Sequence, residues 1–145
     1  WTVDKITNHA DPRMALRSIT WGDRTETIHY GGDCVLFRND VPELIVECKA
    51  YIDTVRLKEL IGESWAIHQD LPGTRRLVPP PRMCVFAGVW EVKESWKRLV
   101  EHHGMRGYVD EFFVVREGKR KDRTQTPRVS VLRRFTDYIR ATVNA

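Results

Sequence analysis

An aspartate, a glutamate and a lysine stand close together in one short stretch of the sequence, from Asp33 to Lys49. Glu47 and Lys49 interrupt an otherwise apolar run, and in an extended strand they lie on the same face. Burying unpaired charge is costly, so charged side chains in such a run need a partner or a function. Two close carboxylates repel each other unless a cation lies between them. Such an oxygen-rich site suits Mg²⁺, which takes one or two carboxylates and keeps several waters.

The stretch that must position these groups has the pattern of two strands folded back on each other. Asp33–Phe37 is an apolar run opened by an acid, and Arg38–Asp40 has the composition of a turn. Pro42 then begins a return run that ends at Lys49. Asp33, at the start of the first strand, can therefore reach Glu47 across the hairpin. Alternation also predicts one wholly apolar face, formed by Leu44, Val46, Cys48 and Ala50.

Asp33, followed after thirteen residues by Glu47-Cys48-Lys49, resembles the PD-(D/E)xK motif of restriction-endonuclease-like nucleases. The phrase DCVLFRNDVPELIVECKAY is particularly similar to the amino-terminal nuclease domains of type I restriction motor subunits and their relatives. The resemblance is close over residues 30–52 and elsewhere extends only to the order of the elements. In two departures, Gly32 replaces the motif's proline, and the Gln-x-x-x-Tyr pattern that often follows on the next helix is absent.

The resemblance implies a three-layer α/β domain over residues 1–145, with a restriction-endonuclease-like core and a mixed central sheet flanked by helices. It implies Mg²⁺-dependent hydrolysis of phosphodiester bonds in DNA, with Mn²⁺ as a substitute ion. Small domains of this type often act as homodimers or as the cutting module of a larger polypeptide. Because the chain begins with Trp1 rather than methionine, we expect a fragment or a trimmed chain.

The same resemblance assigns roles to individual residues. Asp33, Glu47 and the backbone carbonyl of Cys48 would hold the ion, and Lys49 would orient or activate the attacking water. A fourth acid often comes from an upstream element, and Glu26 is our candidate for it. Accessory active-site groups are expected on the helix after the motif, at Lys58 and Gln69.

The net charge of +4 is unevenly distributed along the chain. From Arg116 to Arg140 nine basic residues stand against three acidic ones, so this segment alone carries +6. A cationic stretch beside an acidic metal centre suits a polyanion such as DNA, although a solvated basic loop is the alternative interpretation. Contacts to phosphate position a duplex without reading its sequence. The candidates for them are Arg75, Arg76, Lys119, Arg120, Lys121 and Arg123.

The remaining elements follow from apolar periodicity and turn residues. We expect strands at Ala15–Trp21, Thr25–Tyr30, Met83–Val89 and Val109–Val115, the last near a sheet edge. We expect helices from the cap at Asp53-Thr54 to Gln69, at Lys93–His103 and at Val129–Val143. Strand, helix and strand from Pro42 to Val89 then form a right-handed parallel crossover. Residues expected in the core include Trp65, Trp90, Trp96, Leu132, Phe135, Ile139 and Val143.

Several classes of protein are disfavoured. Cys34, Cys48 and Cys84 lie in apolar runs without the close spacing of a zinc site, so we expect buried, reduced thiols. No apolar run approaches the ~20 residues that cross a bilayer, and no signal peptide opens the chain. We therefore expect a cytoplasmic protein, or a nuclear one in a eukaryote, that is neither secreted nor bound to a membrane.

Two alternative functions remain. One is a module that keeps the fold and binds nucleic acid without cutting it, although an intact set of Asp33, Glu47 and Lys49 argues against this. The other is a nuclease that acts on RNA or on branched DNA. Composition does not separate these from a nuclease of linear DNA, because all three need the same acidic site and the same positive surface.

Overall fold

The computed structural model describes residues 1–7, 10–102, 106–122 and 124–145. The strands are β1 (Thr2–Ile6), β2 (Ala15–Trp21), β3 (Arg24–His29), β4 (Gly32–Arg38), β5 (Val41–Asp53), β6 (Thr74–Arg76), β7 (Arg82–Glu91) and β8 (Val109–Glu117). The helices are the short 3-10 helix η1 (Pro12–Met14) and the α-helices α1 (Thr54–His68), α2 (Glu94–His102) and α3 (Val129–Asn144). No helix in these ranges is both long and apolar enough to cross a membrane.

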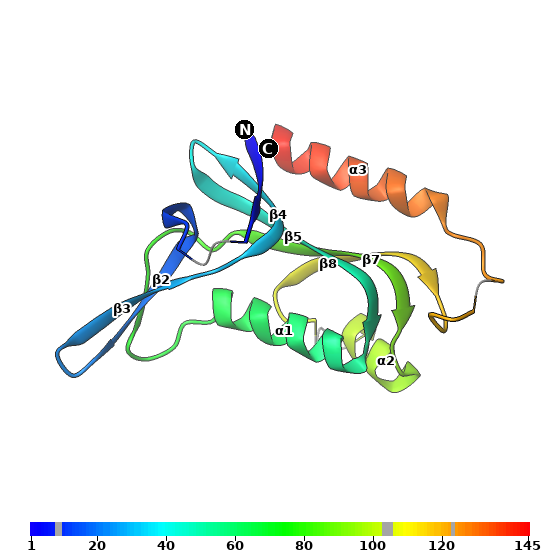
Figure 1. Cartoon of the computed structure of the whole chain (residues 1–145), viewed down its shortest axis with the longest axis horizontal. Helices are drawn as coiled ribbons and strands as arrows, with labels where there is room; N and C mark the ends of the chain where they lie inside the picture. The colour runs from blue at the N-terminus through cyan, green and yellow to red at the C-terminus, as the bar shows by residue number, and fades with distance from the viewer. Residues whose placement is uncertain (8–9, 103–105, 123) are drawn as a thin grey trace.

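Five strands form a mixed sheet in the order β1-β4-β5-β7-β8. β4 is antiparallel to both β1 and β5, whereas β5, β7 and β8 run parallel. Helix α3 lies over one face of this sheet, and α1 and α2 lie over the other (Figure 1). The structure is therefore an α/β fold with helices on both faces of a mixed sheet, and β8 is at an edge as predicted.

The predicted hairpin is confirmed as β4 and β5. Its turn consists of Asn39 and Asp40, which have φ angles of 52° and 63°. A two-residue turn with both φ angles positive matches the twist of the flanking strands, and Asn and Asp tolerate this conformation better than most residues. Pairing of Cys34 with Val46 sets the register that brings the start of β4 beside the middle of β5.

The crossover from β5 through α1 to β7 is also confirmed. The side chain of Asp53 caps α1 by accepting a hydrogen bond from the backbone N–H of Arg56 at 2.9 Å. The face of α1 that carries Leu57 and Leu60 packs on β7, where Met83 is fully enclosed. This packing fixes α1 beneath the middle strands of the sheet.

Several expectations about burial are wrong. Cys48 and Ala50 are exposed, so α3 covers only the first half of the apolar face of β5, where Leu44 and Val46 are buried. Cys84 is buried, but Cys34 is only half-buried. Trp65 is 46% exposed and Leu132 is 50% exposed. In α3 the inward stripe instead begins at Val131, one position earlier.

β2 and β3 form the predicted strands, but they belong to a separate three-stranded sheet with β6. The β2–β3 hairpin projects away from the main sheet (Figure 1). Its turn contains Gly22 with a φ of 58°, a conformation in which glycine has no steric penalty. The small sheet contacts the carboxyl end of α1, and Leu16 of β2 is buried in the core with Phe37 and Ile45.

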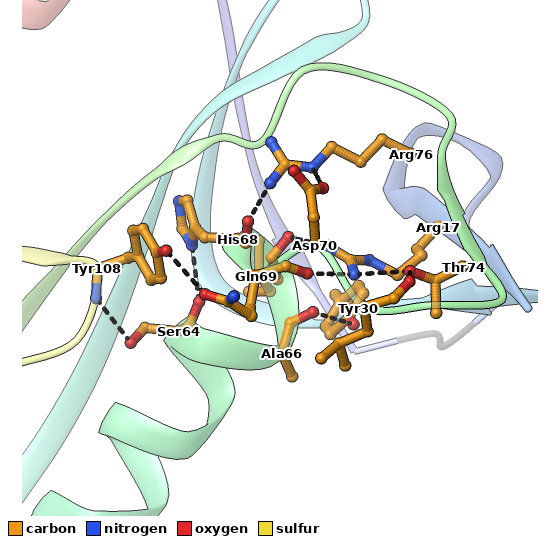
Figure 2. Close-up of polar contacts among 12 residues, drawn as sticks. Arg17, Tyr30, Ser64, Ala66, His68, Gln69, Asp70, Thr74, Arg76 and Tyr108 are labelled. Atoms are coloured by element: carbon orange, nitrogen blue, oxygen red, sulfur yellow. Dashed lines mark hydrogen bonds and ion pairs between the residues drawn. The ribbon is translucent and has the colours of Figure 1, made fainter.

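The final carbonyls of α1 have no partner within the helix, and the structure supplies a donor for each of them (Figure 2). The donor–acceptor pairs are Gln69 N–H to Trp65, Tyr30 Oη–H to Ala66, Arg17 to both Ile67 and Gln69, and Arg76 to His68. Arg17 is 3% exposed, so its guanidinium satisfies these carbonyls in a buried position. The small sheet and the β3–β4 connection are thus held against the end of α1.

Candidate active site

The hairpin brings the three predicted motif residues together. The Lys49 Nζ lies 2.9 Å from the Glu47 Oε2 and 3.8 Å from the Asp33 Oδ2. The Asp33 Oδ2 also accepts a hydrogen bond from the backbone N–H of Cys48 at 2.9 Å. One ammonium therefore lies between two carboxylates that come from adjacent strands.

The local backbone explains why Asp33 points here. A residue's N–H and C=O point to the same neighbouring strand, so the carbonyl of Cys48 faces the side on which Asp33 lies. Gly32 precedes Asp33, and a Cβ there would come within 2.6 Å of the Val35 Cγ2 and 3.2 Å of the Ile45 Cγ2. The crowding explains why a glycine precedes Asp33.

Burial makes Glu47 the electrostatically strained member of the group. Its side chain is 12% exposed, and this burial raises its pKa, with further increases from the charges of Asp33 and Glu63 and opposition from Lys49. Burial opposes the charge of Lys49 as well, but the hydrogen bond and charge of Glu47 outweigh it and raise the Lys49 pKa. Ionised Glu47 therefore carries an unfavourable free energy that a second cation would relieve.

Glu47→Gln is expected to raise the free energy of unfolding at pH 7 in the absence of divalent metal, because the neutral amide avoids the cost of a buried carboxylate. A raised folded-state pKa means that protonation favours the native state, so wild type should gain stability relative to the variant as pH falls. The difference in the free energy of unfolding between Glu47→Gln and wild type should disappear below pH 4.5, the pKa of glutamate in the unfolded state. Urea denaturation from pH 3 to 8 measures this, and a constant difference across that range would contradict it.

The motif opens into a cleft of about 460 Å³ between the main sheet and the second half of α1. Asp33 and Glu47 line one part of it, and its floor is formed by Ile45, Ile67 and Met83. The floor residues are all buried, so the walls are set by rigid core packing. The residues at its polar rim that sequence reasoning missed are Lys5, Thr7, His29 and Glu63.

Glu63 lines the cleft with Asp33 and Glu47, and it is a better candidate for a fourth acid than Glu26. It lies on α1 between Leu60 and Ile67, which are buried at the same face of the helix. Its negative charge adds to the raised pKa of Glu47, and both side chains line the same cleft. A signal for it was present in the sequence, because spacings of three and four place Glu63 beside the apolar stripe.

The residues fit a hard divalent cation held by few protein ligands. In the part of the chain that the structure describes, no three His, Cys, Asp or Glu side chains are arranged to hold a metal ion. Asp33 and Glu47 are nevertheless close enough to share one ammonium, and the Cys48 carbonyl faces the same side. Two carboxylates, one carbonyl and several waters form a coordination that Mg²⁺ accepts.

Three other candidates for this site do not line the cleft. Glu26 is exposed on the projecting strand β3. Gln69 follows the last residue of α1, and its Oε1 accepts a hydrogen bond from the Tyr108 hydroxyl at 3.0 Å (Figure 2). The Lys58 Nζ lies 4.6 Å from the ring centroid of Trp96, against α2. None of these three side chains lies in the lining that contains Asp33 and Glu47.

The two basic candidates on β6 differ in their contacts. Arg75 is exposed at the surface of the small sheet. Arg76 donates to the carbonyl of His68 and forms a 2.9 Å ion pair with Asp70, so its guanidinium already serves the end of α1 (Figure 2). Arg75 is therefore the better placed of the two for a phosphate.

The second basic segment follows β8 and lies at the opposite end of the long axis from the small sheet (Figure 1). Lys119 and Lys121 are exposed. Arg120 forms a 3.1 Å ion pair with Glu91 and lies 3.7 Å from the ring centroid of Tyr51. The predicted phosphate contact at Arg123 lies outside the described residues. Contacts from both basic segments would span the length of the molecule.

Comparison with models of known protein families finds none that matches this chain, and a search of curated proteins finds no similar sequence.

Proposed function

We propose that this chain is a divalent-metal-dependent nuclease, built on a restriction-endonuclease-like core, that hydrolyses phosphodiester bonds in DNA. One observation carries the proposal: the hairpin places Asp33, Glu47 and Lys49 within ion-pair distance of one another beside an open cleft. The antiparallel hairpin followed by a parallel crossover supports the assignment of the core.

Each residue then has a definite task. Asp33, Glu47 and the Cys48 carbonyl hold Mg²⁺ or Mn²⁺. An ion held by these residues would supply positive charge at the scissile phosphate and would lower the pKa of a bound water. Lys49 donates a hydrogen bond to the attacking water or to a non-bridging oxygen, where it offsets the negative charge that develops in the transition state. The apolar floor of Ile45 and Met83 keeps the carboxylates in a poorly hydrated setting, in which their charges act strongly.

Incubation with supercoiled plasmid tests the proposal directly. We expect nicking or linearisation in Mg²⁺ or Mn²⁺ and none after addition of EDTA. A Lys49→Met sample purified in parallel controls for contaminating nucleases. If the wild-type chain cuts no DNA in either metal, or cuts equally well in EDTA, the assignment is wrong.

One observation favours a module that binds nucleic acid without cutting it. Lys49 pairs with both carboxylates, so part of their negative charge is offset without an ion. Binding of DNA in a gel-shift assay, without cleavage in Mg²⁺ or Mn²⁺, would establish that function. Parallel reactions on single-stranded RNA and on a four-way DNA junction identify a nuclease with either of those substrates.

A further inference from the structure

The cleft has a second wall, opposite in character to the carboxylates. Lys5 on β1 and His29 at the end of β3 line it together with Thr7. β1 pairs with β4 so that Asp4 lies opposite Val35 and Ile6 lies opposite Gly32. Lys5 is thus one strand away from Asp33, a separation of about 4.8 Å between neighbouring backbones.

Lys5 is available to bind an anion. Its side chain is exposed, and among the described residues it forms no ion pair or hydrogen bond. The contrast with Lys49 is direct, because Lys49 pairs with two carboxylates in the same cleft. Among the residues that the structure describes, the free ammonium of Lys5 therefore lines the cleft, whereas the ammonium of Lys49 is engaged by two carboxylates of the lining.

The wall between these two ammonium groups is open and fixed. Gly31 is half-buried and lines it without a side chain, so a ligand can approach the backbone there, next to the buried Gly32. The preceding Tyr30 donates a hydrogen bond to the carbonyl of Ala66 at 3.2 Å, which holds this connection against α1 (Figure 2). A strand of nucleic acid that lies along the cleft would pass Gly31 and Gly32 on its way from Lys5 to the carboxylates.

We propose that Lys5 binds the backbone phosphate next to the one that is cut, and so holds the substrate strand against the acidic wall. This inference rests on the proposed nuclease function. Asp33, Glu47 and Glu63 repel a polyanion, so a cation near them in the lining is needed to keep the strand in the cleft. The side chain of Lys5 acts on binding and not on the reacting atoms.

The test is DNA binding without metal, measured by fluorescence anisotropy of a labelled duplex in EDTA over a series of salt concentrations. Lys5→Ala should weaken binding and reduce the slope of log K against log salt by about 0.9, the value for one phosphate contact on duplex DNA. Lys5→Arg should restore most of the DNA affinity and most of the salt slope. Lys93→Ala is the matched control, because Lys93 is exposed and lies outside the cleft.

If Lys5→Ala and Lys93→Ala give the same affinity and the same salt slope, Lys5 has no such role. Cleavage by wild type together with that result would refute Lys5 alone and leave the nuclease standing. Binding that depends on Lys5, without cleavage in Mg²⁺ or Mn²⁺, would keep the phosphate site and refute the nuclease. A dependence on Lys5 seen only with a labelled single-stranded RNA would overturn the assignment to a DNA phosphate.

Discussion

Replacing Lys49 by methionine is expected to lower the single-turnover rate of DNA cleavage by about two to three orders of magnitude, the usual cost of removing one donor from a charged transition state. Methionine keeps most of the length of the side chain and removes its charge. The affinity for Mn²⁺ should rise at the same time, because the ammonium no longer neutralises Asp33 and Glu47. Rapid-quench cleavage and calorimetric titration of Mn²⁺ measure the two effects separately.

The opposite movement of rate and metal affinity is what distinguishes this role from simple damage to the fold. Lys93→Met provides the control, since it makes the same chemical change at an exposed position outside the cleft. Lys49→Met with an unchanged rate would remove Lys49 from the chemistry. A loss of both rate and Mn²⁺ affinity would show that Lys49 supports the structure of the carboxylates instead.

Gly88→Ala is expected to lower the free energy of unfolding by about 2 to 3 kcal/mol, at the upper end for overpacking of a core. A Cβ at this position would lie 2.6 Å from the backbone oxygen of Ala50 on the paired central strand. A backbone atom inside a sheet cannot move aside without shifting the strand. Because Ala50 follows Lys49, the shift should also reduce the cleavage rate. Guanidinium denaturation and plasmid cleavage measure the two consequences.

Gly62→Ala is the matched control for this prediction. Gly62 lies within α1, and a Cβ there meets no atom within 4 Å. Alanine in a helix interior is more favourable than glycine by roughly 0.5–1 kcal/mol, so this variant should be more stable than wild type. The same chemical change is thus expected to have opposite signs at the two positions. Destabilisation of similar size in both would show that the contact with Ala50 is not the cause.

The part of the site that lies within one hairpin could be predicted from the sequence. Asp33, Glu47 and Lys49 are joined by a short turn, and strand alternation alone sets which side chains share a face. Local pattern is sufficient there because few backbone arrangements connect two strands through Asn39 and Asp40. The crossover through α1 was predictable for the same reason, since its cap and apolar stripe are local signals.

The rest of the cleft depends on contacts between distant segments. Glu26 is only seven residues before Asp33, yet β3 pairs with β2 and carries it away on the projecting hairpin. Glu63 is thirty residues after Asp33, and the crossover returns it to the cleft. Lys5 lies in the cleft because β1 pairs with β4, and no turn motif in the sequence predicts that pairing. Proximity along the chain was therefore a poor guide to the fourth acid.

The burial errors have a different physical origin. Along α3 the buried stripe includes Val131 and Thr142, and Tyr138 packs beside the core. Apolar periodicity favours Leu132 over such polar residues, although the other predicted residues, Phe135, Ile139 and Val143, do pack against the core. The face of a helix that becomes buried depends on how the helix packs on the sheet beneath it, and the hydrophobicity of the sequence alone does not predict this packing.

The way in which the small sheet is attached has a consequence for how such a chain could diversify. Arg17, Arg76 and Tyr30 all bind main-chain carbonyls at the end of α1, and every residue type presents the same carbonyl. Substitutions in the last turn of α1 would therefore leave the joint intact. The exposed side chain of Glu63, which faces the cleft, is free to change under selection for new substrates, while the small sheet stays in place.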